Sequence, residues 1–182
     1  MQSIDALRAG LAAALIALIC ACATVPPVQQ AFTNGTDGVV VGGPLPCPGG
    51  VTAVGTGQAV QPMPGPTVRV LSWNLHKNED PGWDDDLARF AAASDLLLIQ
   101  EASLTAALQR ALATAGYDWL LASSFTLNDH ETGVLNAARV RPVSACVQRS
   151  FEPLLQLPKS AVITSYAVRG VEGTLAVEWI ET

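Results

Sequence analysis

The fold is decided by two stretches of sequence, Val68-Arg69-Val70-Leu71-Ser72-Trp73-Asn74 and Leu96-Leu97-Leu98-Ile99-Gln100-Glu101. The apolar runs at 68–73 and 96–100 are each typical of a short buried strand, and residues 83–92 between them predict a helix. A strand–helix–strand crossover sets its strands side by side, with their carboxyl ends at one edge of a sheet. Asn74 and Glu101 are therefore expected to be neighbours in space.

A carboxylate and an amide at one sheet edge are oxygen ligands of the kind that a hard cation such as Mg²⁺ prefers. Two simpler interpretations remain open for these residues. Asn74 could form an Asx turn after its strand, and Glu101 could cap the start of a helix before Leu104. The aspartates at 84–86 also suggest a metal cluster, but the first turn of a helix explains them better, because acidic side chains there complement the helix dipole.

Composition limits the classes of partner. The chain has 182 residues and a net charge of −6, and Lys77 and Lys159 are its only lysines. Affinity for the phosphate backbone of nucleic acids needs clustered basic residues, so broad, non-specific nucleic-acid binding is not expected. A phosphate-bearing substrate would be bound by a local site and a metal.

The N-terminal segment predicts export. After Arg8, residues 9–20 are apolar except for Gly10, and this run is too short to span a bilayer. It ends in Ile19-Cys20-Ala21-Cys22, which resembles a bacterial lipobox with Cys22 as the lipidated residue. We expect residues 1–22 to be a lipoprotein signal peptide and the protein to be anchored by lipid to a membrane of the cell envelope. An ordinary cleaved signal, or a retained membrane anchor, is the alternative.

Cysteine usage follows from that interpretation. If Cys20 is removed and Cys22 is lipidated, Cys47 and Cys146 remain in an oxidising compartment, where they are expected to form a disulfide. The alternative is two separate cysteines. No pair of cysteines has the CxxC spacing, which argues against a zinc site.

The rest of the chain predicts an α+β protein. Proline and glycine are concentrated at 23–66, which is expected to be an extended tether, and the folded domain is expected at 67–182. A helix capped by Ser103 is expected at 104–115, a strand at 118–122 and a polar loop at 123–131. Short strands with antiparallel connections are expected at 132–137, 142–148, 161–168 and 174–180.

Four motifs resemble the endonuclease/exonuclease/phosphatase superfamily, which includes DNase I-like nucleases, abasic-site endonucleases, inositol phosphatases and sphingomyelinases. The resemblance covers about residues 67–177 and fits a bacterial branch of the family. The motifs are Leu71-Ser72-Trp73-Asn74, Leu97-Leu98-Ile99-Gln100-Glu101, Glu131-Thr132-Gly133-Val134-Leu135 and Pro158-Lys159-Ser160-Ala161.

The resemblance implies a DNase I-like β-sandwich flanked by helices, with one divalent cation, Mg²⁺ or Mn²⁺, at the sheet edge. By that match Glu101 is the metal-binding glutamate, and Asn74 lines the same site and orients the metal or the phosphate. His76 and Lys77 follow at the mouth of the site, where they either bind substrate or form a solvated loop. His130 is expected in a surface loop that could reach the rim. The implied substrate is a phosphate ester, whether nucleic acid, phospholipid or a small molecule.

The later motifs of the family do not occur in the 182 residues: there is no Gly-Asp-x-Asn and no Ser-Asp-His. Residues 174–177 resemble the strand that leads to the family's N-x-H, yet the sequence continues Glu178-Trp179-Ile180-Glu181-Thr182. We therefore expect a C-terminally truncated domain, about the first half of the sandwich, impaired because no base activates the attacking water. An uncovered apolar sheet face would favour self-association. The alternative function is a non-catalytic envelope lipoprotein that acts as a binding or scaffold module.

Overall fold

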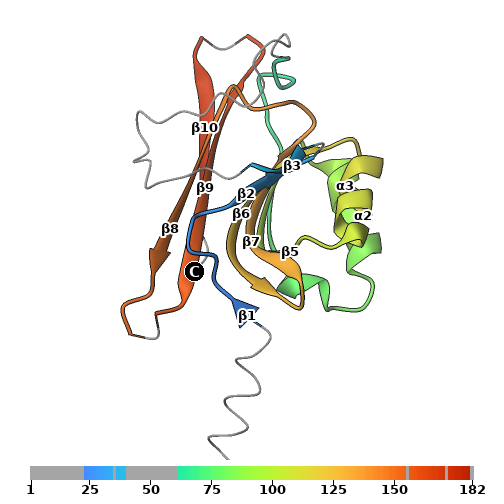
Figure 1. Ribbon diagram of the computed structural model, residues 1–182. Helices are drawn as coiled ribbons and strands as arrows, with labels where there is room; N and C mark the ends of the chain where they lie inside the picture. Colours follow the sequence, from blue (N-terminus) through green and yellow to red (C-terminus); the bar gives the residue numbers. More distant parts are fainter. Residues whose placement is uncertain (1–22, 35, 40–60, 155, 171, 181–182) are drawn as a thin grey trace, which may run out of the picture.

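The computed structural model describes residues 23–34, 36–39, 61–154, 156–170 and 172–180, which form two sheets and two α-helices (Figure 1). The main sheet has seven strands in the order β3-β2-β6-β7-β5-β4, with β1 also paired to β6. The second sheet has the order β10-β9-β8. The strands of the main sheet are β1 (Ala23–Thr24), β2 (Ala31–Thr33), β3 (Thr36–Val39), β4 (Val70–Asn74), β5 (Leu96–Ser103), β6 (Asp118–Leu127) and β7 (His130–Ala138). Those of the second sheet are β8 (Ser144–Phe151), β9 (Pro158–Ala167) and β10 (Thr174–Ile180).

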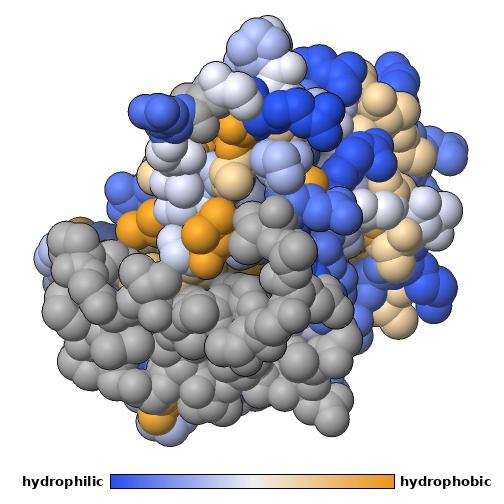
Figure 2. Space-filling model, turned by 90° about the horizontal axis from the view of Figure 1, so that it is seen from above, coloured by the Kyte–Doolittle hydropathy of each residue, from blue (hydrophilic) through white to orange (hydrophobic). Residues whose placement is uncertain are grey.

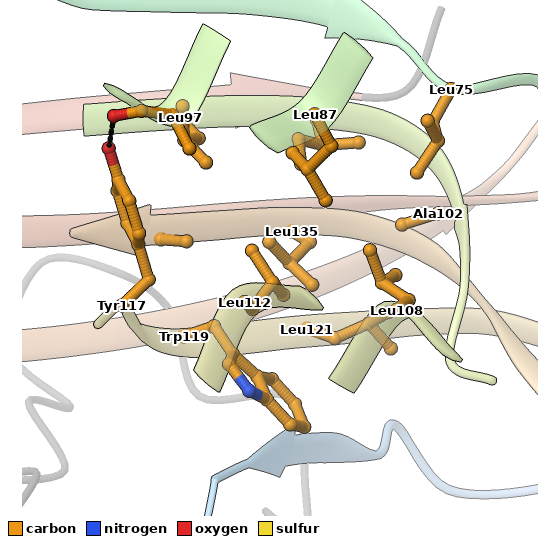
Figure 3. Packing of buried hydrophobic residues seen from close by; sticks show 13 residues of the cluster. Leu75, Leu87, Leu97, Ala102, Leu108, Leu112, Tyr117, Trp119, Leu121 and Leu135 are labelled. Carbon is orange, nitrogen blue, oxygen red and sulfur yellow. Dashed lines mark hydrogen bonds between the residues drawn. The ribbon is translucent and has the colours of Figure 1, made fainter. Parts of the chain in front are cut away.

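The predicted crossover is confirmed. Strands β4 and β5 pair in parallel, with Asn74 opposite Gln100, and α2 (Trp83–Ala93) connects them. A second helix, α3 (Ala106–Thr114), follows β5. Both helices pack on one face of the main sheet, where their leucines meet leucines of β5, β6 and β7 (Figure 3). The labelled members of this core are Leu75, Leu87, Leu97, Ala102, Leu108, Leu112, Tyr117, Trp119, Leu121 and Leu135.

The first four residues of β5, 96–99, are all apolar, as suits a strand whose two faces are both buried. Leu97 and Ile99 point to the helices, whereas Leu96 and Leu98 belong to the core on the other face. Strands β6 and β7 alternate in the same way, and Ala122 and Val134 pack against the second sheet. The expectation of an uncovered apolar face is therefore wrong for the central strands, because β8, β9 and β10 cover it.

The prediction of a polar loop at 123–131 is wrong. Strand β6 runs on to Leu127 and pairs with β7 across a two-residue turn, Asn128-Asp129, in which both φ angles are positive (50° and 63°). Asparagine and aspartate tolerate this left-handed conformation, which matches the twist of a hairpin. Glu131 accepts hydrogen bonds from the hydroxyls of Ser123 and Thr126, so the polar side chains are satisfied within the hairpin.

Three other predictions need correction. Thr105, not Ser103, caps α3, since its side chain accepts a hydrogen bond from the amide of Leu108. Strand β7 does not pair with β8, because the chain crosses to the second sheet between them. The predicted tether also differs: β1, β2 and β3 pair within the main sheet, and Met63 is buried and bridges to Val168.

The carboxyl ends of both helices are tied to a pair of side chains, the buried Tyr117 and the exposed Arg139. The hydroxyl of Tyr117 donates hydrogen bonds to the carbonyl oxygens of Ala91 (3.0 Å) and Ser94 (2.8 Å). The guanidinium of Arg139 stacks over the Tyr117 ring and donates to the carbonyls of Ala91 and Ala115. A cation at two helix C-termini complements both dipoles and adds hydrogen-bond donors for the carbonyls there. This arrangement fixes α2 and α3 relative to the sheet.

A partly buried ion pair joins Asp95, the residue before β5, to Arg69, the residue before β4; the Asp95 side chain is 9% exposed and that of Arg69 is 60% exposed. The Asp95 carboxylate accepts hydrogen bonds from the backbone amide of Arg69 (2.9 Å) and from its guanidinium (2.9 and 3.1 Å). These bonds lower the pKa of Asp95 below its ordinary value, although burial of the carboxyl opposes the shift.

We expect Asp95→Asn to lower the free energy of unfolding at neutral pH by about 2 kcal/mol, the scale of hydrogen bonds to a charged group. Because the pKa is depressed in the folded state, the stability from this carboxylate is present above its unfolded pKa of about 3.9. It is lost as the pH falls through the folded pKa. Urea unfolding at a series of pH values should therefore show a flatter acid limb for Asp95→Asn. An acid limb as steep as the parent's would contradict the assignment.

Candidate functional site

The two residues predicted to meet at the sheet edge are in contact. The amide nitrogen Nδ2 of Asn74, at the end of β4, donates to Oε1 of Glu101 on β5 (2.9 Å). The ammonium group of Lys77 lies 2.5 Å from the other carboxylate oxygen, Oε2. The side chains of Lys77 and Glu101 are each 28% exposed, so this pair is accessible from solvent but partly shielded. A carboxylate, an amide and a cation therefore converge at one edge.

The alternative interpretations of the two residues have different outcomes. Oδ1 of Asn74 accepts a hydrogen bond from the backbone amide of His76 (2.9 Å), so Asn74 does form an Asx turn. Its amide group still contacts Glu101, and the two roles use different atoms. Glu101 does not cap a helix, because α3 begins at Ala106 and its cap is Thr105.

The backbone around the site is held in an uncommon conformation. Three successive residues in the 3-10 turn η1 (His76–Asn78) have φ angles of 47°, 57° and 64°, and Glu101 has a φ of 50°. Left-handed backbone costs a residue other than glycine roughly 1–2 kcal/mol. Such strain persists only where surrounding contacts enforce it, and it concentrates at functional sites. Glu101 also lies where the pairing of β5 with β7 shifts between Ile99 and Ala102, a bulge that re-aims its side chain.

Contacts to neighbouring elements hold the turn after β4. Leu75 is buried, and its amide donates to the carbonyl of Gln100 (2.9 Å). The Asn78 side chain donates to the Ser103 carbonyl (2.6 Å) and to Oγ1 of Thr105 (3.2 Å). Asn78 is a positioning residue that the sequence analysis missed. Asparagine tolerates left-handed backbone, and Asn78 stands beside a polar loop; only this feature of the sequence pointed to a structural role for Asn78.

The electrostatics keep Glu101 ionised. Hydrogen bonds from Lys77, and then from Asn74, lower the pKa of the Glu101 carboxyl below its ordinary value, against the opposing effect of burial. Mg²⁺ commonly binds to one or two carboxylates and completes its shell with water and substrate phosphate, so Glu101 and Asn74 fit it in kind. Within the described residues, no group of three His, Cys, Asp or Glu side chains is placed to hold a metal.

The other predicted residues lie around this centre or away from it. Nδ1 of His76 pairs with Oδ1 of Asp80 at 3.1 Å, and both side chains are exposed. His130 is exposed at the first position of β7, where it pairs with Leu127. Gln100 stabilises a strand end, as its Nε2 donates to the carbonyl of Ile180 (2.8 Å) and so brings the end of β10 to this edge.

The acidic cluster at 84–86 lies in the first turn of α2, as the helix interpretation expects. Cys146 is disulfide-bonded. Cys22 and Cys47 lie outside the described residues, so the predicted lipidation and the predicted pairing with Cys47 remain predictions. Among the described residues, no helix has the length and apolar character needed to cross a membrane.

Comparison with known proteins finds relatives that carry no functional name. No family model matches the sequence. A UPF0294 protein of Vibrio cholerae is 35% identical over 54% of this chain. A UPF0294 protein of Yersinia pestis is 38% identical over 59% of this chain. A UPF0294 protein of Klebsiella pneumoniae is 39% identical over 54% of the chain. The chain spans 35%, 42% and 37% of the length of these three relatives.

One solved structure was also found, that of TDP2 from D. rerio complexed with a single-strand DNA product. It covers 63% of this chain and 46% of its own, with a TM-score of 0.41 and 17% identity.

Proposed function

We propose that Asn74, Lys77 and Glu101 form the metal- and phosphate-binding part of a phosphoesterase site of the endonuclease/exonuclease/phosphatase superfamily, on a DNase I-like sandwich. The observation that carries this proposal is the convergence of a carboxylate, an amide and an ammonium group on strained backbone at one sheet edge. Ordered two-sheet packing with helices outside it is consistent with such a sandwich.

Each side chain has a role in this proposal. Glu101, with Asn74 beside it, would hold the Mg²⁺ or Mn²⁺ ion, which when bound polarises the phosphate and stabilises its developing charge. Asn74 orients the carboxylate through its Nδ2 while the Asx turn fixes its own position. Lys77 occupies the side of Glu101 where a cation would bind, so the ion and the lysine compete for Oε2. Once released, its ammonium is free to bind a phosphate oxygen.

No general base is placed beside Glu101 among the described residues. The Glu101 side chain is hydrogen-bonded to Asn74 and Lys77, and no second carboxylate or imidazole within the described ranges is hydrogen-bonded to it. We propose that this chain binds a phosphate ester in the presence of the metal and hydrolyses it very weakly.

The experiment is an assay of the purified chain with and without Mg²⁺ against bis-nitrophenyl phosphate, DNA and sphingomyelin. It is paired with calorimetric titration of Mg²⁺ and of inorganic phosphate. Metal-dependent phosphate binding supports the proposal. Phosphate binding that does not depend on Mg²⁺, and that is retained in Asn74→Ala and Glu101→Gln, would favour the non-catalytic envelope lipoprotein instead. Robust turnover that Glu101→Gln abolishes would show that the chain carries its own base.

We expect Lys77→Met to bind Mg²⁺ several-fold more tightly than the parent, because the competing ammonium is gone. Phosphate affinity in the presence of Mg²⁺ should fall by about tenfold, the equivalent of one charge-assisted hydrogen bond of roughly 1.4 kcal/mol. Lys159→Met is the matched control, since Lys159 is the only other lysine and lies at the start of β9. Unchanged Mg²⁺ affinity in Lys77→Met would exclude the competition.

We also propose that the chain is exported and anchored by lipid at Cys22. The support is the sequence pattern of residues 9–22. Mass spectrometry of the mature N-terminus decides the point, because a free Ala23 or an unmodified Cys22 would exclude lipidation.

A further inference from the structure

The hairpin that joins β8 to β9 presents large apolar side chains to solvent. Phe151 is 48% exposed, Leu157 is 51% exposed and Leu154 is 85% exposed. Two backbone hydrogen bonds join residues on either side of the tip: the amide of Glu152 donates to the Leu157 carbonyl (2.8 Å), and the amide of Gln156 donates to the Glu152 carbonyl (2.9 Å). Several large apolar side chains exposed together are unusual for a surface that meets only water.

This tip lies at the end of the molecule where the N-terminal segment enters the fold. In Figure 1 the β8–β9 turn and β1 lie together at the lower end. Ala23 pairs with Leu127 beside the β6–β7 turn, and the guanidinium of Arg149 donates to the carbonyl of Pro26 (2.7 Å), which ties the hairpin to this segment. Cys22, the proposed lipidation site, is the residue before Ala23 in the sequence.

The candidate site is at the same end. Strands β4 and β5 are parallel, and both run towards the end of the sheet where β7 begins, because β5 is antiparallel to β7. The end of β10 lies there too, since the Ile180 carbonyl accepts a hydrogen bond from Gln100. Ile180, at that end of β10, is 49% exposed. The opposite end exposes Val70 and Val143, one at the start of β4 and one just before β8. Viewed from above, the described surface at this opposite end is mostly hydrophilic, with hydrophobic residues in small groups (Figure 2).

We propose that the β8–β9 tip is a membrane-docking element that inserts Leu154 and Leu157 into the surface of a lipid bilayer, next to the N-terminal segment. The occupant is a bilayer because Cys22, the proposed lipidation site, directly precedes Ala23 at this end, and the inference rests on that proposed anchor. Arg149 and Lys159 flank the tip at the base of the hairpin, at the level that lipid head groups would occupy. A single lipid chain gives only marginal membrane binding, so a second apolar contact makes attachment stable and sets the orientation.

Tryptophan substitution tests the insertion directly. Leu154→Trp and Val143→Trp are made in the full chain and mixed with phosphatidylcholine–phosphatidylglycerol vesicles whose acyl chains carry bromine. The signal of the four native tryptophans is subtracted with the parent protein. We expect the added fluorescence of Leu154→Trp to shift to the blue and to be quenched by the brominated lipid, and that of Val143→Trp to remain unchanged. Equal quenching of the two variants would overturn the proposal.

A partition measurement keeps the test independent of fluorescence. In an unlipidated Cys22→Ser background, Leu154→Ser with Leu157→Ser should lower co-sedimentation with the vesicles by at least about tenfold, whereas Val70→Ser with Val143→Ser should leave it unchanged. Equal loss in both pairs would overturn the proposal. The proposal would also be overturned if the protein dimerised in a concentration-dependent way, bound no vesicles, and lost dimerisation only in the leucine pair. The tip would then be an interface between copies of this chain.

Discussion

Glu101→Gln is expected to weaken the binding of Mg²⁺ by more than about a hundredfold while changing the melting temperature little. Loss of outer-shell partners alone costs a metal site 10–100-fold in affinity, and Glu101 is the carboxylate of the proposed site. Glutamine has the size of glutamate and can keep the hydrogen bond with Asn74. The substitution therefore removes the charge without disturbing the fold. The ion pair with Lys77 is also lost, but a pair with both partners about a quarter exposed contributes at most about 1 kcal/mol.

Two further variants at this position test the strained backbone. Glu101→Ala and Glu101→Gly both remove the carboxylate, so both should lose cation binding. Glycine adopts a φ of 50° without steric cost and alanine does not, so Glu101→Gly should be more stable than Glu101→Ala by about 1 kcal/mol. At most positions in a strand glycine is the less stable of the two, which makes the sign of the difference informative.

Isothermal titration with Mg²⁺ and thermal unfolding measure these effects, with Glu79→Gln as the control glutamate, because Glu79 is exposed in the loop after η1. If Glu101→Gln bound Mg²⁺ as tightly as the parent, the proposed site would be excluded. If Glu101→Ala were the more stable of the alanine and glycine variants, the strain at this position would be excluded while the cation site could still stand.

The sequence predicted the β4–α2–β5 unit correctly because its elements are local and strongly patterned. The apolar run of β5 needs no tertiary information, and the crossover rule then places Asn74 beside Glu101. For Lys77 the sequence predicts a residue at the mouth of the site that either binds substrate or lies in a solvated loop, but it does not predict the contact with Glu101. Its contact with Glu101 depends on three successive left-handed residues, and no pattern of residue types specifies that conformation in advance.

Polar residues inside the sandwich caused the largest error. Ser123, Ser124 and Thr126 were assigned to a loop because they are polar, yet Ser123 and Ser124 are buried. The hydroxyl of Ser160, on β9, donates to the Ser123 carbonyl (2.9 Å), so the polar groups are bonded between the two sheets. A polar residue can be buried when a hydrogen-bond partner is available. Here that partner is on β9, far away in the sequence, so the sequence alone does not reveal it. The two-residue Asn128-Asp129 turn was the signal that could have revealed the hairpin.

The largest effect on stability is expected from Gly133→Ala. A Cβ atom at Gly133 would lie 2.0 Å from the carbonyl oxygen of Ala122 and 3.0 Å from the Ser124 amide nitrogen. Both are backbone atoms of β6, in the middle of the main sheet, and neither can rotate away as a side chain would. We expect a loss of at least about 3 kcal/mol in the free energy of unfolding, the upper end of the cost of overpacking, measured by urea denaturation.

Gly170→Ala is the matched control for this change. No atom lies within 4 Å of a Cβ built at Gly170, whose φ is 78°, so alanine there should cost only about 1 kcal/mol through its backbone conformation. Similar losses at the two positions would contradict the close approach at Gly133.

Gly133 also bears on the candidate site, because it pairs with Ala102 on β5, directly after the bulge that contains Glu101. Displacing β7 from β6 would move this bulge, so a Gly133→Ala protein that still folds should also bind Mg²⁺ less tightly. The close packing of three strands at a single glycine therefore serves the site as well as the sheet, since it holds the bulge that aims Glu101 at Asn74 and Lys77.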